Sequence, residues 1–326
     1  MATLSFAANA QERAVLDFYT RVDYNWINGN DIASGEESGF CGRYIFLRGY
    51  GDLGNGFKYS FAQRLNTINT NSKNFDSTDW SFLEYTTPGG FWTFTGGKIV
   101  MDVGSYEYDS NPIDIPFFSH YVYRVDAYLP GVSAAIHPTA NDSFAFLLTR
   151  SPYDTDTDNY LGYALEWRGH HGCWHPIYTI GAYEQNPYDM SYQVAFGNLF
   201  QWDKGYVEVD YLRRAIIGEG DSKPFSHHDY TFASRGALRF TDRWSAIYKV
   251  TRDFNNHKCN FDLTLPVNTN NTILGAGFEY YPIKNSQDIR LFGIAIKSIG
   301  DFGGIPNEYF RIDLGLKWKI NLITVK

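Results

Sequence analysis

The sequence predicts an all-β fold: a closed, 16-stranded, antiparallel β-barrel that crosses a membrane. Three observations predict it. Many segments alternate apolar and polar side chains, short and long connections follow each other in turn, and Tyr, Phe and Trp make up 18% of the chain. Aromatic residues favour strands and gather at the two water–lipid boundaries of membrane barrels. No run approaches the ~18 apolar residues that a membrane-spanning helix needs.

The alternation is clearest in the last segment, residues 307–322. Every second side chain is apolar, and the residues between them are charged, polar or glycine. The first segment repeats this pattern, and residues 57–64 and 244–251 follow it in part. A period of two places alternate residues on opposite faces of a strand. We therefore expect one face towards lipid and the other towards a lumen. The apolar positions of the last segment are Phe310, Ile312, Leu314, Leu316, Trp318, Ile320 and Leu322.

The connections between these segments predict the strand number. Seven short turns alternate with eight longer polar segments, which gives 16 strands with both chain ends on the short-turn side. An even number of strands with this alternation is typical of a bacterial outer-membrane barrel with short periplasmic turns and long extracellular loops. A β-sandwich has no such order of connections. The longest connection covers residues 104–127.

The N-terminal residues predict a processing signal. A short apolar run ends in Ala8-Asn9-Ala10, the small-residue pattern of a signal-peptidase site. We expect residues 1–10 to be the tail of a secretory signal and residues 11–326 to form a single barrel domain. An ordinary disordered N-terminus is the alternative. The net charge of −8 argues against a nucleic-acid partner, and the three cysteines show no metal or redox spacing.

The polar face carries many charges, and a barrel of 16 strands leaves a water-filled lumen for them to line. Rings of charge set the ionic preference of a pore. Acidic partners are expected from Asp17, Asp23, Glu208, Asp210, Glu279 and Asp313. The alternative is that these charges only solvate one face of a sheet. The expected pore-lining residues are Arg21, Arg43, Lys58, Arg64, Lys98, Arg235, Arg239, Lys249 and Arg311.

Residues 104–127 are expected to fold inward as a constriction loop, because long ordered loops usually serve a function. Its carboxylates would face lumen bases across the passage, and the resulting field would favour polar solutes. The expected constriction residues are Tyr106, Glu107, Tyr108, Asp109 and Asp114.

Two other roles for this loop, calcium binding and catalysis, have less support in the sequence. Asp109, Asn111 and Asp114 offer oxygen ligands for calcium, but their spacing differs from that of an EF-hand loop and Pro112 stiffens the segment. Glu107 and Asp109 are placed for a carboxylate pair, yet nothing near them in sequence supplies a substrate cleft. We expect no catalysis, no metal and no cofactor. The histidines at 170, 171 and 175 fall in a predicted short turn, where exposure is expected.

Residues 288–299 depart from the alternation because both faces are mostly apolar. Such a strand is expected to be buried on both sides, either at a subunit contact or against an infolded loop. The sequence does not choose between these two.

Several motifs resemble a known family. They are Gly39-Phe40-x-Gly42-Arg43-Tyr44, then Asp79-Trp80-x-Phe82-Leu83-x-Tyr85, then Gly97-Lys98, and Gly104-x-Tyr106-Glu107-Tyr108-Asp109-x-x-Pro112-Ile113-Asp114. This set resembles the Bacteroidota branch of the phosphate-selective porin O and P family. The resemblance implies a 16-stranded barrel in the bacterial outer membrane, surrounded by lipid and lipopolysaccharide, commonly a homotrimer, and passing small hydrophilic solutes.

Phosphate selectivity does not follow from the resemblance. The members that give the family its name use a ladder of inward arginines and a lysine cluster, whereas the expected lumen set here mixes bases and acids. We therefore expect passive diffusion of small solutes or ions, with at most a weak preference for anions. Two alternatives stay open: a structural subunit of a hetero-oligomeric outer-membrane complex with a plugged lumen, and a secreted all-β protein that binds carbohydrate through Trp and Tyr.

Overall fold

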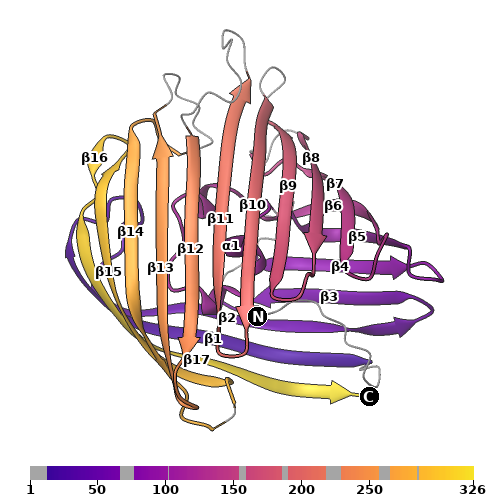
Figure 1. The fold of residues 1–326 in the computed structure, drawn as a ribbon, viewed down its shortest axis with the longest axis horizontal. Coiled ribbons are helices and arrows are strands. Elements are labelled where there is room, and N and C mark those ends of the chain that lie inside the picture. The colour runs from indigo at the N-terminus through magenta and orange to yellow at the C-terminus, as the bar shows by residue number, and fades with distance from the viewer. Residues whose placement is uncertain are drawn as a thin grey trace.

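The computed structural model describes residues 13–66, 77–101, 103–153, 159–185, 190–217, 229–256, 265–284 and 286–326. The segment predicted as a signal tail, residues 1–10, lies outside them. The chain forms a single antiparallel sheet with three short helical turns (Figure 1). Its strands are β1 (Ala14–Gly29), β2 (Gly39–Gly54), β3 (Phe57–Arg64), β4 (Thr78–Thr86), β5 (Trp92–Val100), β6 (Tyr128–Ile136), β7 (Asp142–Arg150), β8 (Leu161–Gly169), β9 (Trp174–Glu184), β10 (Met190–Trp202), β11 (Gly205–Ile217), β12 (Asp229–Arg239), β13 (Trp244–Asn255), β14 (Thr269–Tyr280), β15 (Ile289–Phe302), β16 (Ile305–Pro306) and β17 (Tyr309–Val325). The helical turns are α1 (Tyr106–Asp109), η1 (Pro112–Asp114) and η2 (Val122–Arg124).

The sheet closes on itself. Each strand pairs with its neighbours in sequence, and β1 pairs with both β2 and β17, so that Ala14 lies opposite Val325. The two-residue strand β16 pairs only with β15, at the tip of the β15–β17 connection, and is not part of the wall. Sixteen strands therefore form a closed barrel, and the predicted fold class is confirmed.

The outer face of the barrel is apolar and the inner face is polar, which is the reverse of a water-soluble protein. On β1, Trp26 on the outer face is 44% exposed, whereas Asp23 on the inner face is 1% exposed. The same division holds on β17, where Leu314 points outward and Asp313 inward. A wall with apolar side chains outside and charges inside suits surrounding lipid and an aqueous lumen. The predicted alternation therefore describes the two faces correctly on these strands.

The barrel wall is uneven in height. Strands β3 to β8 have 8 or 9 residues each, and we call them the short wall. Strands β10 to β15 have 11 to 14 residues each, and we call them the tall wall. Figure 1 shows β10 to β13 upright, while β1 to β5 cross the view almost horizontally. The two walls face the lumen from different sides.

The tight turns lie at one end of the barrel. Between β2 and β3, Asn55 and Gly56 both have positive φ angles, of 55° and 85°, which suit a two-residue hairpin. Most of the predicted longer connections fall partly outside the described residues, and which end of the barrel faces which side of the membrane stays a prediction. None of the described helices is long and apolar enough to cross a membrane.

Candidate functional site: the lumen and its infolded loop

The chain leaves the wall after β5 and enters the lumen at Gly104. The φ angle of this residue is 69°, a left-handed conformation that favours glycine. A Cβ atom here would also lie 2.7 Å from Cβ of Ala195 and 3.0 Å from Cβ of Thr179. Farther along, Phe117 packs over Gly275 of β14, where an added Cβ would lie 2.5 Å from the ring. Glycines thus let residues 104–127, which we call the constriction loop after their predicted role, leave the wall and pack against the barrel from inside.

The loop begins with the one-turn helix α1, which a wall residue caps. Asp210 of β11 accepts hydrogen bonds from the backbone N–H of Tyr106 at 2.9 Å and of Glu107 at 3.0 Å, and from Ser105 Oγ at 2.7 Å. The first N–H groups of a helix have no partner within the helix, so a carboxylate there satisfies them. The sequence placed Asp210 inside the barrel but gave no sign of this capping role.

Each predicted constriction carboxylate binds a basic residue of the wall. Buried Glu107 accepts a hydrogen bond from Lys249 Nζ of β13 and two more from Ser119, at 2.8 and 2.6 Å. Asp114 binds Arg290 of β15 at 2.5 Å. A buried charge is costly unless it is paired and hydrogen-bonded, so these contacts hold the loop. The expected open field between loop and wall is replaced by direct ion pairs.

The third carboxylate faces the other side of the barrel. Asp109 binds Arg168 of β8 at 2.9 Å, and Arg168 also binds Glu166 at 2.6 Å.

The two predicted tyrosines are buried in the loop. Tyr106 Oη donates to the carbonyl oxygen of His175 at 2.7 Å, and Tyr108 packs in a core cluster with Met101 and Tyr121.

The end of the loop is fixed by hydrogen bonds and a cation–π contact as well. The backbone N–H of His120 donates to Asp253 at 2.8 Å, and its ring nitrogen Nε2 lies 2.9 Å from Asn271 Oδ1. Tyr121 Oη donates to Gln193 at 2.7 Å, while the guanidinium of Arg214 lies 3.7 Å from the centre of its ring. Strands β10 to β14 therefore hold this part of the loop.

The mostly apolar segment, residues 288–299, is covered by the loop. Phe292, Ile294 and Ile296 of β15 are buried in a cluster with Phe117, whereas Leu291 on the opposite face is 46% exposed. Of the two predicted explanations, packing against an infolded loop accounts for the inner face. Arg290, which binds Asp114, lies on the same face as Phe292. Strand parity could have identified it as a lumen residue, as it could Arg168.

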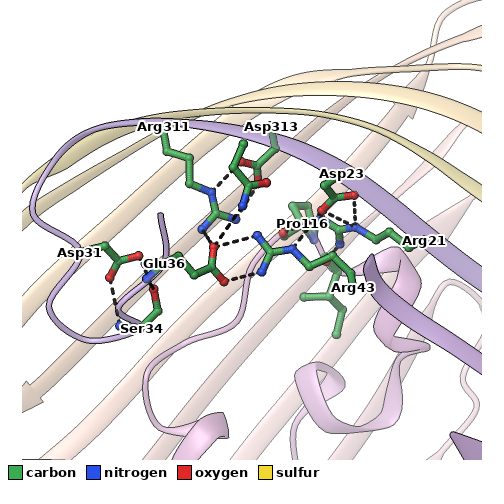
Figure 2. A network of polar contacts seen from close by, with 11 residues as sticks. Arg21, Asp23, Asp31, Ser34, Glu36, Arg43, Pro116, Arg311 and Asp313 are labelled. Carbon is green, nitrogen blue, oxygen red and sulfur yellow. Dashed lines mark hydrogen bonds and ion pairs between the residues drawn. The ribbon is translucent and has the colours of Figure 1, made fainter. Parts of the chain in front are cut away.

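A second network joins the wall to the connection between β1 and β2 (Figure 2). Glu36 lies between two guanidinium groups and binds both Arg43 and Arg311, the latter at 2.8 Å. Arg311 also makes two bonds of 2.6 Å to Asp313. Burial alone would raise the pKa of Glu36, but the hydrogen bonds and charge of Arg43 and Arg311 outweigh it and lower the pKa below its usual value.

Arg21 connects this network to the constriction loop. It binds Asp23 at 2.7 Å and donates to the backbone carbonyl oxygens of Ile115 and Pro116. Arg43 Nε also reaches Asp23, at 3.2 Å. Three arginines thus meet three carboxylates, and the cluster as a whole carries no net charge.

The nine predicted pore-lining residues fall into two groups. Arg21, Lys98, Arg235, Lys249 and Arg311 are buried, and Arg235 binds Glu208 at 2.7 Å and Ser110 of the loop at 2.7 Å. The less buried group is Arg43, Lys58, Arg64 and Arg239. Arg64 binds Asp79 at 2.6 Å, Lys58 lies opposite Glu84 in register, and Arg239 donates to the carbonyl oxygen of Asp242 at 2.9 Å. That any of them contacts a solute stays a prediction.

The loop separates two cavities that share Tyr106, Asp109, Ser110 and Asn111 as lining residues. The first, of about 370 Å³, lies towards the tall wall, and we call it the paired-charge cavity because Asp114–Arg290 and Glu208–Arg235 line it. The second, of about 590 Å³, lies between the loop and strands β2 to β9. We call it the aromatic cavity. Its aromatic lining includes Phe46, Trp80, Phe82, Tyr108 and Tyr128.

The other chemistries considered for the loop find no geometric support in the described residues. Asp109 and Asp114 bind arginines on different walls, and Asn111 caps η1 by accepting from the N–H of Ile113 at 3.2 Å. No group of three His, Cys, Asp or Glu side chains in the described part of the chain is arranged to hold a metal ion. The expectation that all three turn histidines are exposed is wrong for His175, which is the second residue of β9 and is buried, with Nδ1 2.7 Å from Nδ1 of His170.

Several solved structures share this fold. An anion-selective porin from Comamonas acidovorans matches with a TM-score of 0.65 and 11% identity over 95% of this chain and 100% of that one. OmpT of Vibrio cholerae, an outer-membrane protein, matches with a TM-score of 0.63 and 10% identity over 96% and 99% of the two chains. Its trimer form matches with a TM-score of 0.63 and 10% identity over 95% and 100%. No curated protein sequence matches this chain.

The sequence itself matches a protein family. The profile described as phosphate-selective porin O and P covers residues 16–195, which is more than half of the chain. This match agrees with the closed barrel, its charged lumen and its apolar outer face. The chain therefore belongs to the phosphate-selective porin O and P family and is a porin of the bacterial outer membrane.

Proposed function

We propose that this porin allows passive diffusion of small hydrophilic solutes and ions with a weak preference for anions, and that it belongs to the Bacteroidota branch of its family. The observation that carries the proposal is the charge balance around the loop. The carboxylates Glu107, Asp109 and Asp114 each bind a wall cation, and the network around Glu36 is neutral. Paired charges produce a weak net field, which favours polar solutes without holding one of them tightly.

The weak anion preference is assigned to lumen cations without a bound carboxylate. Arg239 is bonded to a backbone carbonyl oxygen, and Arg48 makes no ion pair with any described carboxylate. The half-buried residues Arg43, Lys58 and Arg64 are proposed to line the passage beside them. A phosphate trap is not proposed, because it would require several free cations at one place. The Comamonas porin that shares this fold is described as anion-selective, which supports the sign of the preference.

The proposed assembly is a homotrimer in contact with lipid and lipopolysaccharide. A trimer form is described for the Vibrio protein of the same fold, which supports this assembly. The outer face supports the lipid contact, since Trp26, Phe196 and Phe278 are each more than two-fifths exposed. The short wall is the proposed subunit contact, because its strands of 8 or 9 residues lie at or just below the lower end of the ~9–11 residues that span a bilayer.

Planar-bilayer recording of the purified protein tests the proposal. Discrete ion-conducting steps are expected, with a reversal potential in a KCl gradient that shows a small excess of chloride over potassium flux. Phosphate should pass without blocking the chloride current. A silent barrel would contradict the channel function, and a strong block by phosphate would contradict the proposed selectivity. Recovery of the barrel only with unrelated subunits would favour the accessory role instead.

A further inference from the structure

The aromatic cavity contains an unusual arginine. Arg48 of β2 lines this cavity, and its guanidinium lies 5.4 Å from the ring centre of Tyr50 and 5.5 Å from that of Trp80. No carboxylate in the described part of the chain lies within ion-pair distance of it. Its Nε atom is buried and has no hydrogen-bond partner there. A guanidinium on aromatic rings with unused donors is suited to bind a carboxylate.

The acidic residue opposite Arg48 on the neighbouring strand is already bound elsewhere. Asp17 lies opposite Arg48 in the β1–β2 register, but it binds Lys319 at 2.9 Å and Asn321 at 2.9 Å. The other arginine of the cavity, Arg168, is occupied by Asp109 and Glu166. Of the two arginines among the described lining residues, Arg48 is therefore the one without a bound carboxylate, while Glu84 and Glu166 add negative charge to the lining. One anionic group on a solute would be favoured, and a second would be repelled.

The rings beside Arg48 are held in place. Trp80 Nε1 donates to Ser60 Oγ at 2.8 Å, and the indole packs against Tyr128 with ring centres 5.8 Å apart. Phe82 lines the same cavity. A fixed aromatic surface costs little conformational entropy when a flat ring stacks on it. The volume of about 590 Å³ lies within the range of small-molecule sites.

We propose that the aromatic cavity is a binding site for monocarboxylates that carry an aromatic ring. The carboxylate binds Arg48, and the ring packs against Trp80 and Phe82. This inference rests on the proposed function, because the solute reaches the cavity through the lumen. It adds a preference among the solutes that pass: acids with a ring dwell longer than acids of equal charge without one.

The test is single-channel recording in KCl with benzoate or acetate added at equal concentrations. Benzoate is expected to reduce or interrupt the current in a concentration-dependent way, and acetate is not. The substitution Arg48→Met keeps most of the side-chain volume but removes the charge. It should raise the half-blocking concentration of benzoate by about tenfold or more. Trp80→Phe, which keeps a ring, should raise it less than Trp80→Leu.

The matched control is Arg252→Met. This arginine is exposed, on the face of β13 opposite to Lys249, so its loss removes the same charge outside the lumen. Its benzoate block should equal that of the wild type. Retention of the heat-modifiable, folded form on gels checks that each variant is folded.

The outcomes separate the two proposals. Equal effects of benzoate and acetate, block by glucose at the same concentration, or a block insensitive to Arg48→Met would overturn the site while the ionic current still supports a channel. Absence of any current would overturn the diffusion function. In that case, calorimetric binding of benzoate to the detergent-purified protein tests the site directly, and binding that Arg48→Met leaves unchanged would overturn it.

Discussion

The tall wall and the short wall make different contacts with the constriction loop. The tall wall caps its helix through Asp210 and binds two of its carboxylates through Lys249 and Arg290. The short wall binds the remaining carboxylate through Arg168, whose side chain is one-third exposed. The loop is therefore attached mainly to the tall wall, and the larger of the two cavities lies on the other side. The position of the loop within the lumen follows from which wall supplies the buried partners.

The largest effect is expected from breaking the pair of Glu107 and Lys249. Both side chains are almost completely buried, at 3% and 2% exposure. Lys249→Met leaves Glu107 as an uncompensated charge and should lower the free energy of unfolding by about 3–5 kcal/mol. Conductance should rise as the loop loosens. Denaturant unfolding in detergent and single-channel recording measure the two effects, and the double variant Glu107→Gln/Lys249→Met should recover part of the stability. Equal stability of both variants would show that this pair does not hold the loop.

A smaller effect is expected from removing the helix cap. Asp210→Ala removes the partner of the Tyr106 N–H, leaves the Glu107 N–H with Ser105 Oγ alone, and should cost about 1–2 kcal/mol. Asp210→Asn retains an acceptor and should cost less. Noise in the open-channel current is expected to increase from the wild type to Asp210→Asn and from there to Asp210→Ala. A quiet channel in the alanine variant would contradict the capping role.

Low pH should weaken another contact between the loop and the tall wall, the ion pair of Asp114 and Arg290. Burial alone would raise the pKa of Asp114, but the positive charge of Arg290 outweighs it and holds the pKa well below its usual value. Since the folded pKa is lower than the unfolded value of about 4, this pair stabilises the barrel fully above about pH 4 and loses its contribution as the pH falls through the folded pKa. Unfolding midpoints measured between pH 7 and pH 3 should decline less steeply in Asp114→Asn than in the wild type. Parallel declines would contradict this.

The smallest effect is expected on the short wall. Arg168→Met removes a partly exposed partner of Asp109 and Glu166 and should change stability by no more than about 1 kcal/mol. Conductance should change less than in Lys249→Met. If Arg168→Met opened the channel as far as Lys249→Met does, the two walls would share the loop equally, and the comparison between them would be wrong.

The wall of the barrel could be predicted from the sequence because a strand repeats every two residues. Trp26 and Asp23 differ in burial as their parity requires, and the turn at Asn55 interrupts the pattern where the chain reverses. Parity also places Arg168 and Arg290 inside, although the apolar residues around Arg290 obscured it. The capping role of Asp210 could not be predicted, because it joins residues 104 positions apart with no local pattern.

The loop shows why the charged residues in the sequence were not enough to predict its contacts. Glu107, Asp109 and Asp114 were expected on one long acidic connection, but their orientation depends on which wall each of them reaches. Tertiary pairing decides this, since an i, i+2 spacing fixes a common face only in an extended strand and α1 is helical. The aromatic cavity was missed for the same reason: Phe46, Trp80 and Phe82 come from two different strands.

The seam between β1 and β17 has a consequence for the order of assembly. The barrel can close only when its first and last strands meet, so closure requires almost the whole chain. The tall-wall partners of the loop are also late in the sequence: Asp210 follows Ser105 by 105 positions, and Lys249 follows Glu107 by 142. Contacts this distant form slowly, because a long segment must be ordered before they contribute. The docking of the loop is therefore completed late in folding, and a truncated chain that lacks the tall wall lacks these partners of the loop.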